Sequence, residues 1–336
     1  MPGPRDSLAE LNRVLDLTDQ GRFAEVLEHL GDRGPEAIES SPTLALHYGI
    51  AQGRLGRYSD SAQWVKIALD GAVAHGDRVL EARTLNARGA IALESGRPDE
   101  AQEFFGRALA EAKELNDHET VGRCCNNLGI ISNLRGKHSE AVAAYTMALA
   151  AYQQAGSLPG VATTEHNLRI TYRDLGHLEQ ALKAADRAVS TAEAGGNRAL
   201  AAYARVGRAE IKTLAREPAV AQREVLHALA VHREMGDVVW EAEDLRVLAM
   251  TQAALGDLTD AEETYRDVLE RADLHQRPLL AATAGHELAR LLAGQGRREE
   301  ARETAHTARV QFAALGAEAA VDQLDAFLET QLGHTG

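Results

Sequence analysis

The sequence predicts an all-α solenoid, and three observations lead to that prediction. Glycines recur every 40 residues, and Arg216 holds the one skipped place in the series Gly56, Gly96, Gly136, Gly176, Gly256 and Gly296. Small residues keep the same phase at fixed distances before and after these glycines. Aromatic residues make up only 4% of the chain, and the abundance of Ala, Leu, Glu and Arg favours helix over sheet. A fixed period of this length indicates stacked structural repeats.

A second series of breaks divides each repeat into two helices. Twenty residues after all but one of the glycine places lies another turn residue, in the series Gly76, Asn116, Gly156, Gly196, Gly236 and Gly316. Glycine and asparagine adopt the left-handed conformation that ends helices, so each repeat is expected to hold two helices of about 17 residues. Pro98 and Pro218 fall where second helices should begin, as the missing N–H of proline requires. Ser59, Ser139 and Thr259 are expected to be N-caps.

The two ends of the chain differ from the middle. Gly21 precedes Gly56 by only 35 residues, so residues 7–40 should form a shorter first repeat that opens with a helix from Leu8 to Leu17. Residues 41–316 follow as seven 40-residue repeats. Residues 317–332 place Leu324, Phe327 and Leu328 on one face and should form a capping helix that covers the last repeat. No linker or change of composition interrupts residues 1–336, so one continuous domain is expected.

The positions of small and bulky residues predict how the helices pack. Small residues lie seven before, five after and twelve after the glycine place, and bulky residues lie nine after it, at Val65, Phe105, Tyr145, Val225 and Tyr265. Small side chains let two helix axes approach closely, and the bulky ones fill the remaining space.

This pattern resembles the tetratricopeptide repeat. The best copy runs from Asn127-Leu128-Gly129 through Gly136, Ala141 and Tyr145 to Ala148-Leu149, and the resemblance covers roughly residues 7–316. It implies a right-handed α-solenoid of about eight helix pairs with a C-terminal capping helix. The 40-residue period is similar to the long variety found in bacterial signalling regulators and spindle-orientation adaptors. Arg169 and Arg216 replace expected small residues, which should weaken repeats five and six.

Composition and charge exclude several classes of partner and location. The net charge of −14 argues against nucleic acid and anionic membranes, because both require clustered Lys and Arg. Two cysteines indicate a reducing compartment. The N-terminal residues lack the features of a secretory signal, and no stretch is long and apolar enough to span a membrane, so a cytoplasmic protein is expected.

Catalytic and metal-binding motifs are weak. The 13 histidines form no H-E-x-x-H motif, and no phosphate-binding glycine loop occurs. Cys124 and Cys125 are adjacent on a helix, so their side chains diverge and should be buried rather than ligate a metal together. We therefore expect no enzyme, no metal and no cofactor.

The resemblance implies that the first helix of each repeat lines a concave surface where ligands bind. Its ligand-facing places fall on Arg83, Asn86, Arg123, Asn126, Asn127, Ile130, Asn133, His166, Asn167, Ile170, Arg173 and Tyr203. Asparagine amides can hold the backbone of an extended peptide, and arginine can grip carboxylates. Alternatively, these asparagines bridge neighbouring helices and these arginines pair with acids of the chain. Beyond Tyr203, where Glu210 and Glu243 oppose Arg246 and Arg290, packing between repeats is favoured over a second ligand surface.

Three functions remain open at this point. The first is a non-catalytic scaffold that binds a peptide or protein segment, acidic or with a free carboxylate. The second is a peptide-sensing regulatory receptor that changes its superhelical shape on binding. The third is self-assembly into a homo-oligomer through the same groove.

Overall fold

A computed structural model describes residues 4–333, and within them the chain is helical throughout. Its helices are α1 (Pro4–Asp19), α2 (Phe23–Gly31), α3 (Pro35–Glu39), α4 (Pro42–Arg54), α5 (Tyr58–His75), α6 (Arg78–Glu94), α7 (Pro98–Glu114), α8 (His118–Leu134), α9 (His138–Ala155), α10 (Leu158–Asp174), α11 (Leu178–Ala194), α12 (Arg198–Leu214), α13 (Pro218–Met235), α14 (Val238–Leu255), α15 (Leu258–Leu274), α16 (Pro278–Gly294), α17 (Arg298–Ala314) and α18 (Glu318–Phe327). A π-helical turn, Leu328–Leu332, follows α18. The predicted α-solenoid is confirmed, although the short helix α3, which buries Ile38, was not foreseen.

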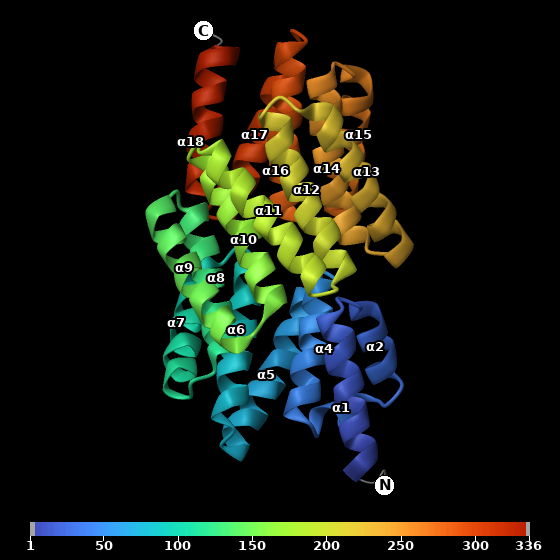
Figure 1. Cartoon of the computed structure of the whole chain (residues 1–336), viewed down its shortest axis with the longest axis vertical. Coiled ribbons are helices and arrows are strands. Elements are labelled where there is room, and N and C mark those ends of the chain that lie inside the picture. The colour runs from blue at the N-terminus through green and yellow to red at the C-terminus, as the bar shows by residue number, and fades with distance from the viewer. Residues whose placement is uncertain (1–3, 334–336) are drawn as a thin grey trace. The chain divides into compact units, whose positions relative to one another are not determined.

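The contacts group the chain into two compact units, Met1–Asn127 and Leu128–Gly336, with the boundary inside α8. Within each unit, consecutive helices pack as pairs, such as α4 with α5 and α10 with α11 (Figure 1). We name these the first unit and the second unit. The expectation of one continuous domain over residues 1–336 stays a prediction.

The turn residues adopt the backbone conformation that their sequence pattern predicts. Gly136 has φ +70°, and Gly176 has φ +76°. Arg216, which occupies a glycine place, adopts φ +67°. The turn at Arg216 therefore has the same left-handed backbone conformation as the glycine turns. A residue with a side chain pays a strain energy in this conformation that glycine does not.

The helix caps lie at other positions than the sequence suggested. Ser59, Ser139 and Thr259 lie inside their helices, and the N-caps there are Arg57, Lys137 and Asp257, whose side chains accept no capping bond. That prediction was wrong. The side-chain caps belong instead to the first helices of the repeats, at Asp77, Ser157, Asn197 and Asp237. These residues directly follow the second series of breaks, and the first three of them begin helices that carry predicted ligand positions, α6, α10 and α12.

The small-residue places are sites of close helix contact, as predicted. A Cβ built on Gly129 would lie 2.6 Å from the ring of Tyr145, and one on Gly89 would lie 2.5 Å from the ring of Phe105. The second helix of each of these repeats therefore places its bulky residue against the bare backbone of the first.

Arg169 fits into its small-residue place because the residues around it are small. Ala185 stands where Phe105 and Tyr145 stand in other repeats, and a Cβ built on Gly207 of α12 would lie 2.8 Å from Nε of Arg169. The buried guanidinium pairs with Glu210. Arg169 is thus a member of a salt-bridge network between repeats rather than a defect of the repeat.

The last helix of the second unit packs back on the turn between α8 and α9. Leu324 and Phe327 of α18 belong to an apolar cluster against which Leu134 packs. A Cβ built on Gly136 would lie 3.3 Å from Cβ of Ala319. The last helix, α18, therefore packs against residues near the start of the second unit. It covers apolar side chains of α17 and of the end of α8.

Candidate ligand-binding surface

In the first unit, the predicted asparagines of α6 and α8 meet each other. Nδ2 of Asn127 donates to Oδ1 of Asn86 over 3.1 Å, and the thiol of Cys124 donates to the same oxygen over 3.6 Å. Among the described residues, Nδ2 of Asn86 and Oδ1 of Asn127 have no hydrogen-bond partner. Both side chains are half-buried. This pair therefore bridges two repeats and still offers one amide donor beside one amide acceptor.

The two predicted arginines of the first unit lie near acids of the chain. Nε of Arg83 donates to Oδ2 of Asp117 over 3.2 Å, and Nε of Arg123 donates to Oε1 of Glu119 over 3.1 Å. About half of each arginine side chain remains exposed, at 53% and 50%. Because half of each arginine side chain faces solvent, a ligand carboxylate can reach these guanidinium groups and compete with Asp117 and Glu119 for them.

His47 of α4, which was not among the predicted residues, lies within the electrostatic influence of both arginines. Its Nδ1 lies 3.2 Å from Oγ1 of Thr18, whose hydroxyl donates to the carbonyl of Val14, so His47 donates and Thr18 accepts. Burial, together with the charges of Arg123 and Arg83, lowers the pKa of His47 to about 4. The imidazole is therefore neutral at neutral pH. His47 lies nine residues before Gly56, the place that Asn127 and Asn167 hold in later repeats, and this register was the available signal.

In the second unit, Asn133 and Arg173 are committed to internal bonds. Asn133 donates to Asp174 over 3.2 Å and accepts from the hydroxyl of Thr171 over 2.8 Å. Arg173 binds Asp174 through Nε and Nη2 and Glu210 through Nη1, the last over 2.6 Å. These side chains bridge helices, which was the alternative that the sequence left open.

Glu210 forms the centre of a buried salt-bridge network in the second unit. Arg169, Arg173 and Arg246 all pair with it, and Arg169, Glu210 and Arg246 are at most 3% exposed. Burial opposes ionisation of Glu210, but the three guanidinium charges outweigh it and hold its pKa well below the usual value. This network explains why the second half of the chain mixes acids and arginines on its first helices.

Arg246 extends the network to the next repeat. It donates to Glu243 over 2.7 Å and to Glu287 of α16 over 2.6 Å. Burial raises the pKa of Glu287 to about 7, with Arg246 opposing that shift. The network thus links four successive first helices, α10, α12, α14 and α16.

Three rings of the second unit form a continuous stack across successive repeats. The centroids of His166 and Tyr203 lie 4.2 Å apart, and those of Tyr203 and Trp240 lie 4.9 Å apart, in both cases stacked. His166 is buried, and burial together with the charge of Arg169 holds its pKa well below the usual value. The imidazole is therefore an internal packing element, whereas Tyr203 and Trp240 remain partly exposed.

The remaining predicted residues differ in burial. Asn126 is buried, and Asn167 and Ile170 are half-buried. Ile130 packs against the cluster that contains Ala141 and Tyr145. The structure joins Asn86 to Asn127 and His166 to Tyr203. Half-buried or exposed predicted residues with polar atoms left over after these bonds include Arg83, Asn86 and Asn127 of the first unit.

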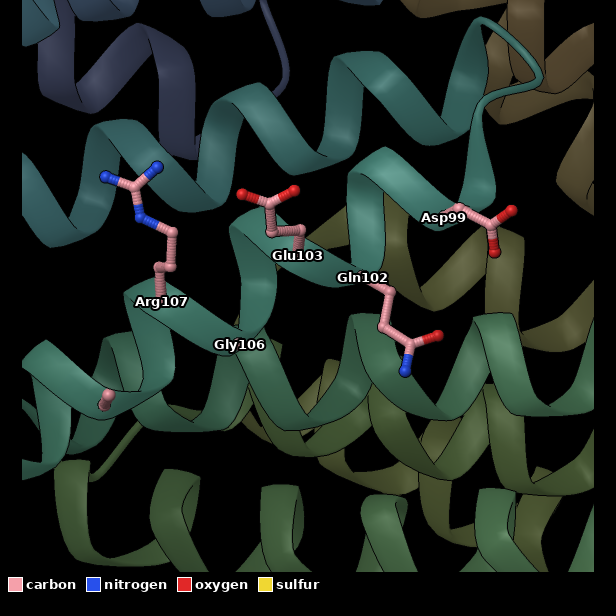
Figure 2. A pocket seen from close by; sticks show the side chains of 6 residues that line it. Asp99, Gln102, Glu103, Gly106 and Arg107 are labelled. Carbon is pink, nitrogen blue, oxygen red and sulfur yellow. The ribbon is translucent and has the colours of Figure 1, made fainter.

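A separate shallow hollow lies along α7. Its lining residues all come from that one helix, and Figure 2 shows Asp99, Gln102, Glu103 and Arg107 projecting from it. No second helix contributes a wall, so this is an open helix surface rather than an enclosed site.

The described part of the chain contains neither a candidate metal site nor a membrane-spanning helix. Among residues 4–333, no cluster of three or more His, Cys, Asp or Glu has the geometry to hold a metal ion. None of the described helices combines the length and apolar character needed to cross a membrane. Cys124 and Cys125 are buried, as expected, and burial raises the pKa of the Cys124 thiol to about 12.

Comparison with known proteins identifies the repeat. Residues 80–154 and 124–194 match the family model for the tetratricopeptide repeat. The chain contains tetratricopeptide repeats. One curated relative is the regulatory protein AfsR of Streptomyces griseus, 28% identical over 175 residues, which are 52% of this chain and 17% of that protein. The match therefore spans only a small part of the relative.

Solved structures share the fold of this chain at low sequence identity. The apo form of RapI aligns with a TM-score of 0.64 and 12% identity, over 82% of this chain and 98% of that one. NprR in complex with its cognate peptide NprX aligns with a TM-score of 0.55 and 17% identity, over 86% of this chain and 82% of that one. At these low sequence identities, the comparisons establish that this chain shares the helical-repeat architecture of those proteins.

Proposed function

We propose that this chain binds an extended peptide segment of a partner on the first helices of its first unit. Binding serves a regulatory role and involves no catalysis. The observation that carries the proposal is the Asn86–Asn127 pair, with one unused amide donor beside one unused amide acceptor. A peptide group needs this combination, because its carbonyl accepts and its N–H donates.

The arginines beside this pair define the partner more closely. Arg83 and Arg123 lie on the same two helices, three to four residues before Asn86 and Asn127, which is one helical turn. A peptide held by the asparagine pair would thus place a neighbouring carboxylate at the guanidinium groups. We infer an acidic segment, or one that ends in a free carboxylate.

The comparisons support a peptide ligand at the level of the fold. NprR, whose architecture this chain shares, was solved with its cognate peptide NprX. Residues that hold a ligand on such a frame are particular to each protein, so the asparagine pair and not the frame carries the assignment.

Binding of a peptide selected against the full chain from a displayed library tests the proposal. Asn86→Ala/Asn127→Ala is expected to weaken the peptide at least about tenfold, the loss of one to two net hydrogen bonds. Gln102→Ala on the outer surface of α7 is the matched control. Arg83→Glu/Arg123→Glu should abolish binding of an acidic peptide, while Arg107→Glu should not. Unchanged affinity in both double variants, at unchanged helicity, would contradict the proposal.

A second candidate function is a sensor module in a larger regulator. The matched segment makes up only 17% of AfsR, so a segment similar to this chain forms part of a much longer regulatory protein there. The salt-bridge network of the second unit joins four repeats, so displacement of one helix would alter its neighbours. Small-angle scattering separates the two candidates. A change in the scattering curve on adding the selected peptide favours the sensor, and an unchanged curve favours the scaffold.

A further inference from the structure

Arg246 on α14 is shared by three carboxyl groups. Its Nη1 lies 2.6 Å from Oε1 of Glu287 on α16, and its Nη2 lies 2.7 Å from Oε1 of Glu243 and 3.4 Å from Oε1 of Glu210. Glu210 has two further arginine partners, but Arg246 is the one basic residue of the described chain that forms an ion pair with Glu287 or Glu243. Glu287 therefore depends on a guanidinium group that it shares with two other acids.

The ion-paired cluster around Arg246 contains one more carboxyl group than it has guanidinium groups. Its ion pairs join four carboxyl groups to three guanidinium groups. His166, which accepts from Arg169, is neutral because burial holds its pKa well below the usual value. With every carboxyl group ionised, the cluster would carry one net negative charge. Its charged members are Asp174, Glu210, Glu243, Glu287, Arg169, Arg173 and Arg246.

Glu287 is the acid of this cluster whose ionisation is least supported by its partners. Its Oε1 accepts from Arg246, but its Oε2 is buried and accepts no hydrogen bond of regular geometry from the described residues. Both oxygens of Glu210 accept from guanidinium groups, and both oxygens of Asp174 accept from side chains. The side chain of Glu243 is 31% exposed and so reaches water. A buried charged oxygen without a donor is costly, so a proton on this cluster is expected at Glu287.

We infer that Glu287 is a proton-binding site that couples the packing of α16 against α14 to pH. The carboxyl group holds a proton in mildly acidic solution, and the contact between the two helices weakens when the proton leaves above neutral pH. The side chain is 22% exposed, which gives the proton a route to solvent in the folded protein. Such a site in the second unit is independent of peptide binding to the first unit.

Two acids oppose the ionisation of Glu287, and two arginines favour it. Burial raises its pKa to about 7, and the charges of Glu210 and Glu243 act in the same direction, whereas Arg246 and Arg173 act against it. These groups lie on α10, α12 and α14. The direction of the pKa shift thus agrees with the excess of one carboxyl group and with the unbonded oxygen.

The remaining neighbours of Glu287 on α15, α16 and α17 are neutral or exposed. On α15, burial and the charge of Glu287 raise the pKa of the Tyr265 hydroxyl well above its usual value, so the phenol is uncharged. On α16, burial and the charge of Arg290 lower the pKa of His286 to about 4, so this imidazole is neutral near pH 7, and Arg290 itself is exposed. The buried residues of α17 are apolar, at Ala301, Ala305, Ala308 and Phe312.

The sign of the effect follows from proton linkage. Glu287 has a pKa of about 7 in the folded chain against a usual value of 4.5, so the folded state binds the proton more tightly than the unfolded state. The stabilising contribution is complete below about pH 4.5 and is lost as the pH rises through about 7. Once ionised, Glu287 repels Glu210 and Glu243 and keeps a buried oxygen without a donor. Movement of α16 that exposes the carboxylate relieves both.

Urea unfolding of the full chain from pH 5 to pH 8 tests the proton site. Fluorescence of Trp240 in a Trp64→Phe background follows the second unit alone, because the chain has two tryptophans. Glu287→Gln imitates the protonated acid, since its amide oxygen can accept from Arg246. This variant should match the reference protein at pH 5 and be more stable at pH 8, by roughly tenfold to a hundredfold in the unfolding equilibrium constant. A difference that does not change with pH would overturn the inference.

A second variant tests the charge count while Glu287 stays in place. Glu243→Gln removes one negative charge from the cluster, so Glu287 should ionise at lower pH and the loss of stability between pH 5 and pH 8 should shrink. Glu234→Gln, which removes an exposed acid paired with Arg198, is the matched control and should leave that loss unchanged. Equal behaviour of these two variants would contradict the proposed proton site, even if Glu287→Gln fails to fold.

Hydrogen exchange followed by mass spectrometry locates the effect in the structure. Wild type and Glu287→Gln are compared at the same pH, so the intrinsic pH dependence of exchange cancels. Peptides from α14 and α16 should exchange equally in the two proteins at pH 6 and faster in wild type at pH 8. Equal exchange at pH 8, or faster exchange confined to other helices, would show that the proton does not control this contact.

Discussion

Nδ1 of His232 on α13 lies 2.7 Å from Oδ2 of Asp244 on α14, and both side chains are completely buried. Nε2 of His232 donates to the carbonyl of Ala199 over 3.2 Å. Since both ring nitrogens face acceptors, the pair holds a proton between Nδ1 and Oδ2. Burial raises the pKa of Asp244 to about 6. Burial alone would lower the pKa of His232, but the bond to Asp244 raises it above the usual value.

The pair should make the stability of the second unit depend on pH in an unusual direction. Both groups bind protons more tightly when folded, so their contribution is present at low pH and is lost as the pH rises. The loss from Asp244 falls between about pH 4 and pH 6, and that from His232 follows above about pH 6.5. Asp244→Asn leaves a neutral His232 that accepts from the new amide, which removes this dependence. Urea unfolding from pH 4 to 8 measures it. A difference between wild type and variant that stays constant with pH would refute the assignment.

Glu210 should be far more important for stability than an ion pair on the surface. Glu210→Gln leaves the buried Arg169 and Arg246 without their common counter-charge, and we expect a loss of about 3–5 kcal/mol in the free energy of unfolding. The comparison is Glu234→Gln, which breaks the exposed pair with Arg198 and should leave the unfolding midpoint within error. Urea unfolding followed by circular dichroism decides between them. Equal midpoints for the two variants would show that the network contributes nothing.

The close contact between Gly129 and Tyr145 predicts that the effect of Gly129→Ala on stability changes sign when Tyr145 is also replaced by a smaller residue. Gly129→Ala pushes a methyl group into the buried ring of Tyr145 and should cost about 1–3 kcal/mol. In a Tyr145→Val background the same change should stabilise by about 1 kcal/mol, because alanine is the better helix former. Ala209 and Val225 already occupy the corresponding places in one packed cluster. A Gly129→Ala effect that is the same in both backgrounds would argue against the contact.

The fold was predictable because its information is local and repeated. The turns need a residue that adopts a positive φ near +70°, and this requirement recurs as a glycine at the same place of most repeats. Close helix packing recurs as a small residue opposite a bulky one, as in Gly89 with Phe105 and Gly129 with Tyr145. Caps were harder to place, because many residues can occupy the start of a helix. Asp77 caps its helix, but Ser59 does not.

The candidate site was only partly predictable, because its members bond across repeats. The repeat register placed Asn86 and Asn127 on helices that face each other. It could not show that their amides keep one donor and one acceptor unbonded, whereas the amide of Asn133 is bonded to both Asp174 and Thr171. Arg173 looked equally available in the sequence. Its partner Glu210 lies 37 residues away, and no local pattern joins the two. Charge pairs between repeats become visible only when the helices are packed.

The contact between Gly136 and Ala319 gives the last prediction, because the chain offers a matched control for it. Gly136 and Gly176 occupy the same place in successive repeats with nearly equal φ values. A Cβ on Gly176 meets nothing within 4 Å, whereas one on Gly136 meets Cβ of Ala319 at 3.3 Å. Gly176→Ala should therefore cost only the left-handed strain, about 1–2 kcal/mol. Gly136→Ala should cost more, because α18 must also move. Adding Ala319→Gly should remove the excess and leave the strain, and urea unfolding of the four combinations at these two positions measures the coupling. If Gly136→Ala and Gly176→Ala lower stability equally, α18 does not press on this turn in solution.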